Sequence, residues 1–290
     1  MSDSVGCTLI TGSTGMLGRY VMDFFSDTVP NDVRVLTRQH CDLVNPRSAY
    51  EAVKTIRPAA ILHLAAETEV DLCERDPGRA GLVNHLATDA IARAASETGA
   101  WLLYVSTSNV FGREGKLIYN ELDLPSPINY YGRSKLQGEF AIRQRLPDTH
   151  LIVRAGWMIG GGSRHDHKFV GKVVKQIRDR VPELRAVTDK FGTLTSANLL
   201  ARFIVSALRA RSTGTFHFCS IGVTTRFDVA QTIADTLSYE GKLIGVPSSI
   251  FPLSAPRPQS EGIESIYPMI SGASPGSWRD DLASYLSEFR

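Results

Sequence analysis

The sequence is poor in cysteine, in long apolar runs and in charge of one sign. Its four cysteines lie far apart without a Cys-x-x-Cys pair, so we expect free thiols rather than disulfides or a zinc site. No apolar run approaches the roughly 18 residues of a membrane helix, and the start of the sequence has no basic segment typical of a secretion signal. These absences predict a cytoplasmic protein that does not bind a membrane.

Charge and composition exclude further classes. Lysine and arginine together number 32 and aspartate and glutamate 30, a formal net charge of +2. Such a balance gives no electrostatic basis for a nucleic-acid partner. The hydrophobic fraction of 43% is typical of a globular protein and excludes a disordered chain. A length of 290 residues fits one large domain or two intertwined ones.

In the first half of the chain, short apolar runs alternate with longer helical patterns. The predicted strands, whose continuous apolar character is typical of burial on both faces, are residues 8–10, 33–36, 60–64, 101–106 and 151–153. The predicted helices are residues 17–25, 47–56, 79–98 and 131–146. This alternation predicts an α/β fold, a doubly wound parallel sheet of the Rossmann type with helices on both faces.

The second half has a weaker pattern. We expect helices at 169–181, 196–208, 227–237 and 278–289, with strands at 184–187 and 215–218. Residues 245–277 carry six of the 14 prolines and are expected to be mostly loop. We therefore predict a dinucleotide-binding domain and a smaller, discontinuous substrate-binding lobe. The domain comprises residues 1–155 with returning segments 183–220 and 275–290, and the lobe comprises residues 156–182 and 221–274.

A glycine-rich turn joins the first predicted strand to the first predicted helix. Gly12 permits the tight turn, Gly15 lets the backbone approach a pyrophosphate, and Gly18 lets the helix pack closely on the sheet. The alternative is a purely structural turn, but the strand–turn–helix context favours dinucleotide binding. The expected cofactor-binding residues of this loop are Gly12, Ser13, Thr14, Gly15, Met16, Leu17 and Gly18.

Arg38 lies 20 residues after Gly18, at the end of the second predicted strand. An acidic residue near this point would bind the ribose 2′-hydroxyl of NAD. Thr37 followed by Arg38 suits a 2′-phosphate instead, because a guanidinium forms charge-assisted bonds to phosphate. The alternative is an ordinary surface arginine. We therefore expect NADP, with NADPH preferred, and leave NAD open.

Tyr131 and Lys135 are four residues apart, one turn of a predicted helix, so their side chains lie on the same face. A lysine ammonium and an oxidised nicotinamide nearby are expected to lower the tyrosine pKa from its ordinary value near 10. Such a spacing also arises by chance. Upstream, a buried strand ends in Ser106-Thr107-Ser108, where a hydroxyl can hold a substrate carbonyl oxygen or merely cap a loop.

Together, these motifs resemble an extended short-chain dehydrogenase/reductase, and the resemblance covers most of the chain. Further segments resemble the dTDP-4-dehydrorhamnose reductases in particular. They are Arg154-Ala155-Gly156-Trp157, Phe169-Val170 and residues 189–195, 255–258 and 277–282. The resemblance implies an NADP-dependent reductase that transfers a hydride to the ketone of a nucleotide-activated 4-keto-6-deoxy sugar.

The resemblance also implies individual roles. The catalytic residues would be Thr107, Tyr131 and Lys135, with Tyr131 and Lys135 also at the cofactor. Further cofactor contacts are expected from Asp42 and Leu43 beside the adenine and from Leu64, Ala65 and Ala66 at a strand end over the cofactor. The expected substrate contacts are Thr68, Trp157 and Arg257.

Three departures from the family pattern stand out. Arg19-Tyr20 replaces an acidic residue associated with a metal-bridged dimer, so we expect no metal and leave a homodimer open. Leu194 stands where the family usually has proline. Residues 259–263 replace the usual Ser-x-Leu ending, which leaves the sugar and the nucleotide open. We expect the acidic residues Glu67, Glu69 and Asp71 and the segment His165-Asp166-His167 to be solvated rather than catalytic or metal-binding.

Two other functions fit the same fold. One is a sugar-nucleotide epimerase, which would keep its nicotinamide bound. Ser108-Asn109 follows Thr107 where dehydratases carry Asp-Glu, which argues against elimination of water. The other is a non-catalytic NADP-binding regulatory subunit, similar to the β subunit of methionine adenosyltransferase. The intact Thr107, Tyr131 and Lys135 favour an enzyme.

Overall fold

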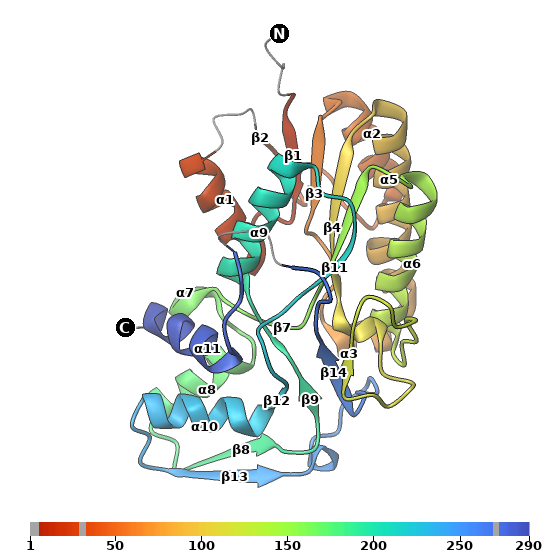
Figure 1. The fold of residues 1–290 in the computed structure, drawn as a ribbon. Helices are drawn as coiled ribbons and strands as arrows, with labels where there is room; N and C mark the ends of the chain where they lie inside the picture. The colour runs from red at the N-terminus through yellow and green to blue at the C-terminus, as the bar shows by residue number, and fades with distance from the viewer. Residues whose placement is uncertain (1–5, 29–32, 269–272, 290) are drawn as a thin grey trace.

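The larger part of the molecule is built on a parallel sheet of six strands (Figure 1). The structure is a computed structural model that describes residues 6–28, 33–268 and 273–289. The strand order is β11-β6-β4-β3-β1-β2, and every neighbouring pair is parallel. The strands are β1 (Thr8–Thr11), β2 (Val33–Leu36), β3 (Ala60–His63), β4 (Trp101–Thr107), β6 (His150–Ala155) and β11 (Gly214–Phe218).

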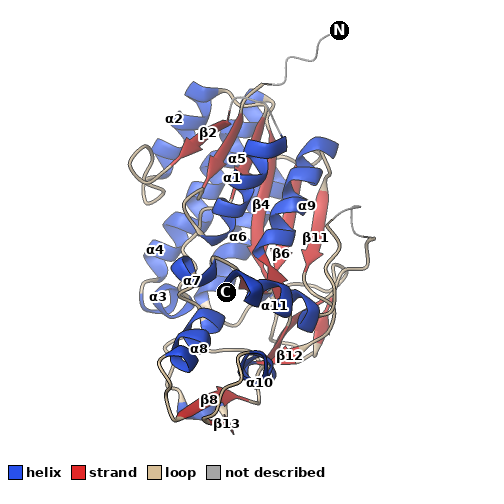
Figure 2. Cartoon of the chain, turned by 90° about the vertical axis from the view of Figure 1, so that its left-hand side faces the viewer, coloured by secondary structure: helices blue, strands red, loops and turns tan. Residues whose placement is uncertain are grey.

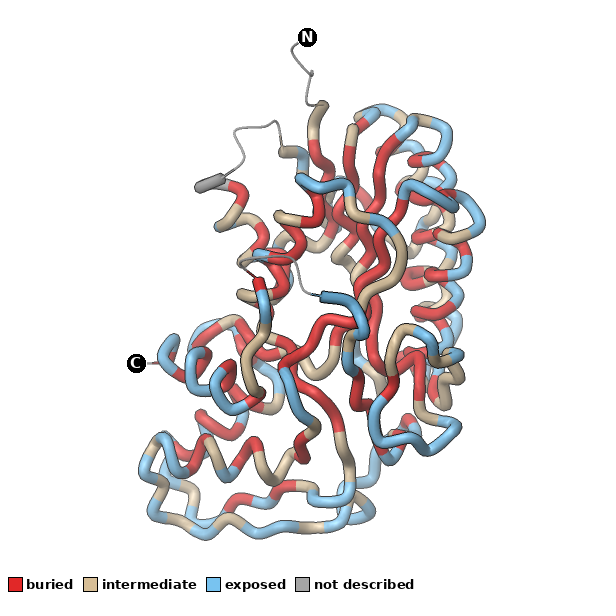
Figure 3. The backbone as a smooth tube through the Cα atoms, in the orientation of Figure 1, coloured by how far each residue is buried: buried red, intermediate tan, exposed pale blue. Residues whose placement is uncertain are grey.

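Helices cover both faces of this sheet (Figures 1 and 2). On one face, α1 (Met16–Thr28) and α9 (Ala197–Ala210) pack together over the sheet. On the other face lie α2 (Pro46–Ile56), α5 (Ala87–Thr98) and α6 (Tyr130–Arg145). The four inner strands β1, β3, β4 and β6 are almost completely buried, whereas the edge strands β2 and β11 are only partly buried (Figure 3). The predicted doubly wound α/β fold is therefore confirmed.

The chain changes direction across the sheet at β1. It leaves β1 for β2 on one side through α1 and returns to β3 on the other side through α2. Thr11 pairs in register with both Leu36 and His63, so the three strands end at the same level. In an open α/β sheet such a point leaves a crevice at the carboxyl ends of the strands, which is where ligands bind.

A second, smaller core lies beyond these carboxyl ends, and we call this part of the molecule the smaller lobe (Figure 1). Its strands are β5 (Ile118–Tyr119), β7 (Trp157–Ile159), β8 (Glu183–Val187), β9 (Phe191–Gly192), β10 (Leu194–Ser196), β12 (Thr224–Thr225), β13 (Lys242–Val246) and β14 (Ser260–Ile263). Its helices are α7 (Gly162–His165), α8 (Phe169–Arg178), α10 (Arg226–Thr236) and α11 (Trp278–Leu286).

Short helical turns complete the chain. They are α3 (Val70–Arg75), α4 (Pro77–Gly81), the π-helical turn η1 (Leu82–Leu86), and the 3₁₀ turns η2 (Ser108–Val110), η3 (Ser248–Ile250) and η4 (Ser287–Phe289). In the part of the chain that the structure describes, no helix is long and apolar enough to cross a membrane.

The packing of two segments differs from the predicted domain boundaries. We assigned residues 183–196 and 275–290 to the dinucleotide-binding domain, but Leu184, Leu194 and Leu282 pack in the smaller core. The reason is pairing: β8 joins β13 rather than the large sheet, and α11 buries its apolar face against the helices of the lobe. Residues 197–218 pack on or pair with the large sheet, as α9 and β11. Segment 245–277, expected to be mostly loop, also contributes β14 and the end of β13.

Candidate active site

A cleft of about 550 Å³ separates the large sheet from the smaller lobe. Every residue that the sequence analysis proposed for cofactor, catalysis or substrate lines this cleft. We call one side the sheet wall, formed by residues 12–18, 36–38, 41–44, 64–68, 105–107, Tyr131 and Lys135. We call the other side the lobe wall, formed by Trp157, Lys168, Phe169, Arg226, Arg257 and Glu261.

The glycine turn on the sheet wall is shaped for close approach. Gly12 has a φ of +74°, and a Cβ on Gly18 would lie only 2.2 Å from the carbonyl oxygen of Gly12. Helix α1 therefore packs directly on the turn, as predicted. A Cβ on Gly15 would meet only the Gly12 oxygen, at 3.4 Å, among the described residues. This opening beside the N-terminus of α1 fits a pyrophosphate bound by backbone N–H groups.

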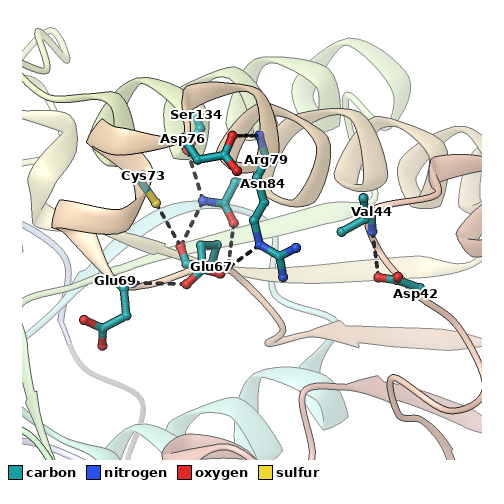
Figure 4. A network of polar contacts seen from close by, with 9 residues as sticks. All are labelled: Asp42, Val44, Glu67, Glu69, Cys73, Asp76, Arg79, Asn84 and Ser134. Atoms are coloured by element: carbon teal, nitrogen blue, oxygen red, sulfur yellow. Dashed lines mark hydrogen bonds and ion pairs between the residues drawn. The ribbon is translucent and has the colours of Figure 1, made fainter.

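The residues at the end of β2 also suit the binding of a dinucleotide. Arg38 is exposed and lines the cleft, next to Thr37, whose hydroxyl lies 3.1 Å from His40 Nδ1. Asp42 lines the same end of the cleft, and its Oδ1 accepts a 3.0 Å hydrogen bond from Val44 N (Figure 4). A guanidinium without an acidic residue at the end of β2 fits a ribose 2′-phosphate.

A buried histidine ties the glycine turn to the neighbouring strand. The Thr88 hydroxyl donates to the Asn84 carbonyl and therefore accepts from His63 Nε2, 3.0 Å away. His63 Nδ1 therefore accepts from the Thr11 hydroxyl, which lies 2.8 Å away. Thr11 Oγ1 also accepts from Ala65 N at 3.2 Å. Burial and the charge of Lys135 lower the pKa of His63 to about 3, so the ring is neutral. The ends of β1 and β3 are thereby held at one level.

Thr107, Tyr131 and Lys135 meet in the cleft, where the sequence analysis expected them. Thr107 ends β4, and Tyr131 and Lys135 lie one turn apart in α6. The Thr107 hydroxyl acts on the Tyr131 phenol and favours its ionised form. Lys135 Nζ donates to the carbonyl of Val105 at 2.8 Å and lies 3.9 Å from the centre of the Tyr104 ring. A hydroxyl, a phenol and an amine therefore converge where the central strand of the sheet ends.

The pKa values of Tyr131 and Lys135 are set mainly by burial. Burial raises the pKa of Tyr131 to about 12, against the lowering effect of the Thr107 hydroxyl, so the expected lowering by Lys135 does not outweigh burial. Burial lowers the pKa of Lys135 to about 7, although the carboxylate of Glu139 acts to raise it. Desolvation dominates because both side chains are almost fully buried. At neutral pH the phenol is protonated and able to donate a proton.

Gly132 and Asn129 explain how Tyr131 reaches this position. The Asn129 side chain caps α6 by accepting from Gly132 N at 2.8 Å, and its Nδ2 donates to Asn109 Oδ1 at 3.1 Å. A Cβ on Gly132 would lie 2.0 Å from the Asn109 carbonyl oxygen. The N-terminus of α6 therefore packs directly against η2. Asn109 N in turn donates to the Thr107 hydroxyl oxygen at 3.2 Å.

A buried ionic cluster supports the same strand end. Glu139, one turn after Lys135 in α6, accepts from Arg154 Nη2 at 2.7 Å and from Arg143 Nη2 at 3.0 Å. Its other oxygen accepts from the Ser106 hydroxyl at 2.6 Å. Although burial acts to raise it, Arg154 holds the pKa of Glu139 below its usual value. Sequence reasoning missed this cluster because its members come from β4, α6 and β6.

A polar network holds the loop that carries Thr68 (Figure 4). The Asn84 side chain accepts from Glu67 N at 2.8 Å and donates to the Glu67 carbonyl and to the Ser134 hydroxyl, both at 3.0 Å. Glu67 also faces Arg79, with 3.5 Å between the charged groups. The predicted helix 79–98 is interrupted at Asn84 by η1, where the Thr88 hydroxyl donates to the Asn84 carbonyl. Glu67 is thus part of the site's framework rather than simply solvated.

The lobe wall contains Trp157 and two residues that the sequence analysis did not propose, Glu261 and Arg226. The buried Glu261 Oε2 accepts from Asn109 Nδ2 at 2.6 Å and from Trp157 Nε1 at 3.2 Å. Burial raises the pKa of Glu261, and the nearby Arg226 opposes that shift. The Arg226 guanidinium stacks on the indole of Trp157, 3.8 Å from the ring centre. The only sequence signal was that Glu261 falls in the departing segment 259–263.

Arg257 lines the cleft as predicted, but its guanidinium already has partners. Nη2 lies 2.9 Å from Asp71 Oδ2, and Nη1 donates to the Ala255 carbonyl at 2.8 Å. Asp71 also accepts from Ala255 N at 2.9 Å. Asp71, which we expected to be solvated, therefore attaches segment 255–257 to the start of α3.

Comparisons with known proteins agree with this geometry. The family described as the RmlD substrate binding domain matches residues 7–290. The dTDP-4-dehydrorhamnose reductase of Salmonella typhimurium is 34% identical over 265 residues, 86% of each chain. The solved dTDP-4-dehydrorhamnose reductase of Yersinia enterocolitica is 54% identical, with a TM-score of 0.96 over 98% of this chain and 100% of that one. The Bacillus anthracis reductase solved with NADP is 26% identical, with a TM-score of 0.88 over 98% and 99%.

Proposed function

The chain belongs to the RmlD substrate binding domain family, and from that premise we propose that it is an NADPH-dependent reductase of dTDP-4-dehydrorhamnose or a closely related dTDP-4-keto-6-deoxy sugar. The observation that carries the proposal is the convergence of Thr107, Tyr131 and Lys135 opposite the lobe wall, in one cleft with the glycine turn. The resemblance drawn from the sequence is confirmed by the family match and by the named relatives.

The sheet wall holds the cofactor in this proposal. The turn at 12–18 binds the pyrophosphate through backbone N–H groups, and Arg38 binds the 2′-phosphate that distinguishes NADP from NAD. Asp42 and Leu43 lie at the adenine, and Leu64, Ala65 and Ala66 lie over the cofactor. When bound, NADPH supplies the hydride for the reduction. We propose a preference for NADPH because Arg38 occupies the position at which NAD enzymes carry an acid.

Tyr131 and Thr107 act on the oxygen of the sugar ketone, Tyr131 as proton donor and Thr107 as hydrogen-bond donor. The phenol is protonated at neutral pH because burial raises its pKa to about 12. As the sugar ketone becomes an alkoxide, Tyr131 Oη donates its proton to that oxygen, and the Thr107 hydroxyl donates a hydrogen bond to it. Groups that point at a developing negative charge before the reaction begins lower the barrier without reorganising.

Lys135 has a positioning role. Its Nζ is held by the Val105 carbonyl and by the face of the Tyr104 ring, so the amine points to one place in the cleft. We propose that it binds the nicotinamide ribose hydroxyls. Burial lowers its pKa to about 7, against the opposing charge of Glu139.

The test is NADPH oxidation with a panel of 4-keto-6-deoxy sugars carrying dTDP, GDP, UDP or CDP. We expect turnover with the dTDP sugar, detected as loss of NADPH absorbance and as one reduced sugar per NADPH consumed. An epimerase would convert the sugar without net NADPH consumption, and a regulatory subunit would bind NADPH without turnover. Either result contradicts the proposal.

A further inference from the structure

Arg226 is held in an unusual position on the lobe wall. It is the first residue of α10, and its guanidinium carbon lies 3.8 Å from the centre of the Trp157 ring and 4.9 Å from that of Phe169. All three residues line the cleft. A planar guanidinium stacked on aromatic rings keeps its N–H donors at its edge, where they remain available for other partners.

The cationic side chains that line the cleft differ in what they already bind. These residues are Arg38, Arg79, Lys135, Lys168, Arg226 and Arg257. Arg79 and Arg257 face carboxylates, and Lys135 donates to a backbone carbonyl. Within residues 6–28, 33–268 and 273–289, the guanidinium of Arg226 makes no hydrogen bond or ion pair. Of the two arginines on the lobe wall, Arg226 is therefore the one whose guanidinium has no hydrogen-bond or ion-pair partner among the described residues.

The carboxylate of Glu261 forms no ion pair with Arg226. Glu261 acts on Arg226 electrostatically, but its Oε2 is occupied by Asn109 and by the Trp157 indole. Burial lowers the pKa of Arg226 to about 10, against the opposing charge of Glu261, so the side chain is still a cation at neutral pH. A partly buried cation with free planar donors, beside a ring that faces the substrate, calls for an anionic group of the ligand.

We propose that Arg226 binds the diphosphate of the nucleotide-sugar substrate, with its edge donors directed at phosphate oxygens. This inference rests on the proposed function and deepens it by assigning the substrate's charged group to a residue. The cofactor's own pyrophosphate has a separate place at the glycine turn, which follows β1 in the large sheet, whereas Arg226 begins α10 in the smaller lobe (Figure 1). The sugar then lies along Trp157, between Arg226 and Tyr131.

The test compares binding of dTDP and of thymidine, which has no phosphate, to the wild-type protein and to Arg226→Gln, by calorimetry or competition. We expect Arg226→Gln to weaken dTDP about 10- to 100-fold, the range for hydrogen bonds to a charged group, and to leave thymidine unchanged. Arg226→Lys keeps the charge but not the planar fork, so its loss should be smaller, about three- to tenfold. In steady-state assays KM for the sugar nucleotide should rise more than kcat falls.

Arg279→Gln is the matched control. Arg279 also stacks on an indole, 4.2 Å from the centre of the Trp278 ring, but it is exposed and does not line the cleft. Its substitution should leave dTDP affinity unchanged. Circular dichroism and the thermal unfolding midpoint show that each variant is folded, so that NADPH affinity remains an independent readout.

Three results would overturn the inference. The first is unchanged dTDP affinity in Arg226→Gln. The second is an equal loss of dTDP and thymidine, which would mean that Arg226 acts through the packing of the lobe. The third is a loss of NADPH affinity instead, which would place the cofactor at Arg226. A wild-type protein that binds NADPH but not dTDP would instead contradict the proposed function itself.

Discussion

The two walls of the cleft differ in how completely their polar groups are satisfied. On the sheet wall, Lys135 donates to a carbonyl and Ser106 donates to a buried carboxylate. His63, which directly precedes wall residues 64–68, is bonded through both ring nitrogens. On the lobe wall, the donors of Arg226 are free of protein partners in the described part of the chain, and Glu261 is buried with a raised pKa. The polar groups of the sheet wall are therefore held in place by the protein alone. On the lobe wall, the guanidinium of Arg226 is left to bind an anionic ligand.

The walls also differ in how they are assembled. The sheet wall is made of strand ends in register and of the first residues of α1 and α6. The lobe wall is made by contacts between distant segments, such as Trp157 with Glu261 and Asn109 with Glu261, 104 and 152 residues apart. We therefore expect substitutions on the sheet wall to affect cofactor binding and the chemical step, and substitutions on the lobe wall to affect substrate affinity.

The largest effect should come from Tyr131→Phe on the sheet wall. The change removes only the phenolic hydroxyl, so the reaction loses its proton donor while the ring still packs. Reduction should fall by about 10²- to 10⁴-fold, the usual contribution of a general acid, and NADPH affinity should be unchanged. Single-turnover rates and NADPH titration measure the two quantities.

Tyr130→Phe is the control, because Tyr130 is the neighbouring exposed tyrosine whose ring contacts Arg133. Thr107→Val in the Tyr131→Phe background should cost less than it does alone, since both groups act on one oxygen. A Tyr131→Phe enzyme with the parent rate would place the chemistry elsewhere in the cleft.

Arg38→Asp tests the part of the sheet wall that is proposed to bind the cofactor's 2′-phosphate. We expect NADPH to bind about 10- to 150-fold more weakly, because one or more charged hydrogen bonds to the 2′-phosphate are lost. NADH affinity should stay constant or rise. Arg47→Asp makes the same charge change on α2, outside the cleft, and should leave both affinities unchanged. An unchanged ratio of NADPH to NADH affinity in Arg38→Asp would assign the 2′-phosphate to another residue.

Glu261→Gln tests the lobe wall with a change of charge alone. Because both hydrogen bonds converge on Glu261 Oε2, the Gln amide oxygen can accept them in the same place. Removing a negative charge near a bound diphosphate should strengthen substrate binding about two- to tenfold, seen as a lower KM. Glu264→Gln, outside the cleft, should have no such effect. A higher KM in Glu261→Gln would mean that the carboxylate accepts a hydrogen bond from the sugar.

The smallest effect concerns the stability of the fold in acid and should trace to His63, which directly precedes wall residues 64–68. The folded state holds His63 neutral, with its pKa lowered to about 3, whereas the unfolded chain takes up this proton below pH 6.5. Because the unfolded state then binds more protons, stability must fall as the pH drops from 6.5 toward 3. The expected loss is about 1 kcal/mol between pH 6 and pH 5 for this histidine.

His217, whose pKa burial lowers to about 4, should add to the loss in the same direction. His63→Gln keeps an acceptor and a donor but cannot titrate. The number of protons taken up on unfolding in acid should therefore fall by close to one. Urea unfolding at several pH values measures this slope. An unchanged slope would show that His63 titrates normally in the folded protein.

The sequence predicted the sheet wall better than the lobe wall for a physical reason. The glycine turn, the strand ending at Thr107 and the Tyr131–Lys135 spacing are local patterns, and the parallel sheet brings them together. The strands of the lobe are short and pair across long separations, as β8 does with β13 and β14 with β5. No local periodicity indicates such pairing, so the domain boundary at 183–196 and the strand β14 escaped prediction.

The same distinction explains the functional residues that sequence reasoning missed. Asn109, Glu261 and Arg226 have no motif of their own, and each acquires its role from contacts made only in the folded chain. The pKa of Tyr131 shifts upward rather than downward for a similar reason. Charge was read from the sequence, but the degree of burial that dominates the shift depends on the packing of α6 against β4 and η2.

The packing of α11 has a consequence for the order in which the molecule forms during translation. The six-stranded sheet has all its strands once β11, which ends at Phe218, has been made. The smaller core also needs Trp278, Leu282 and Phe289. A nascent chain can therefore build the glycine turn and the Thr107–Tyr131 pair while its lobe is still incomplete. Ribosome-bound intermediates should acquire the ability to bind NADPH before they acquire the ability to bind a sugar nucleotide.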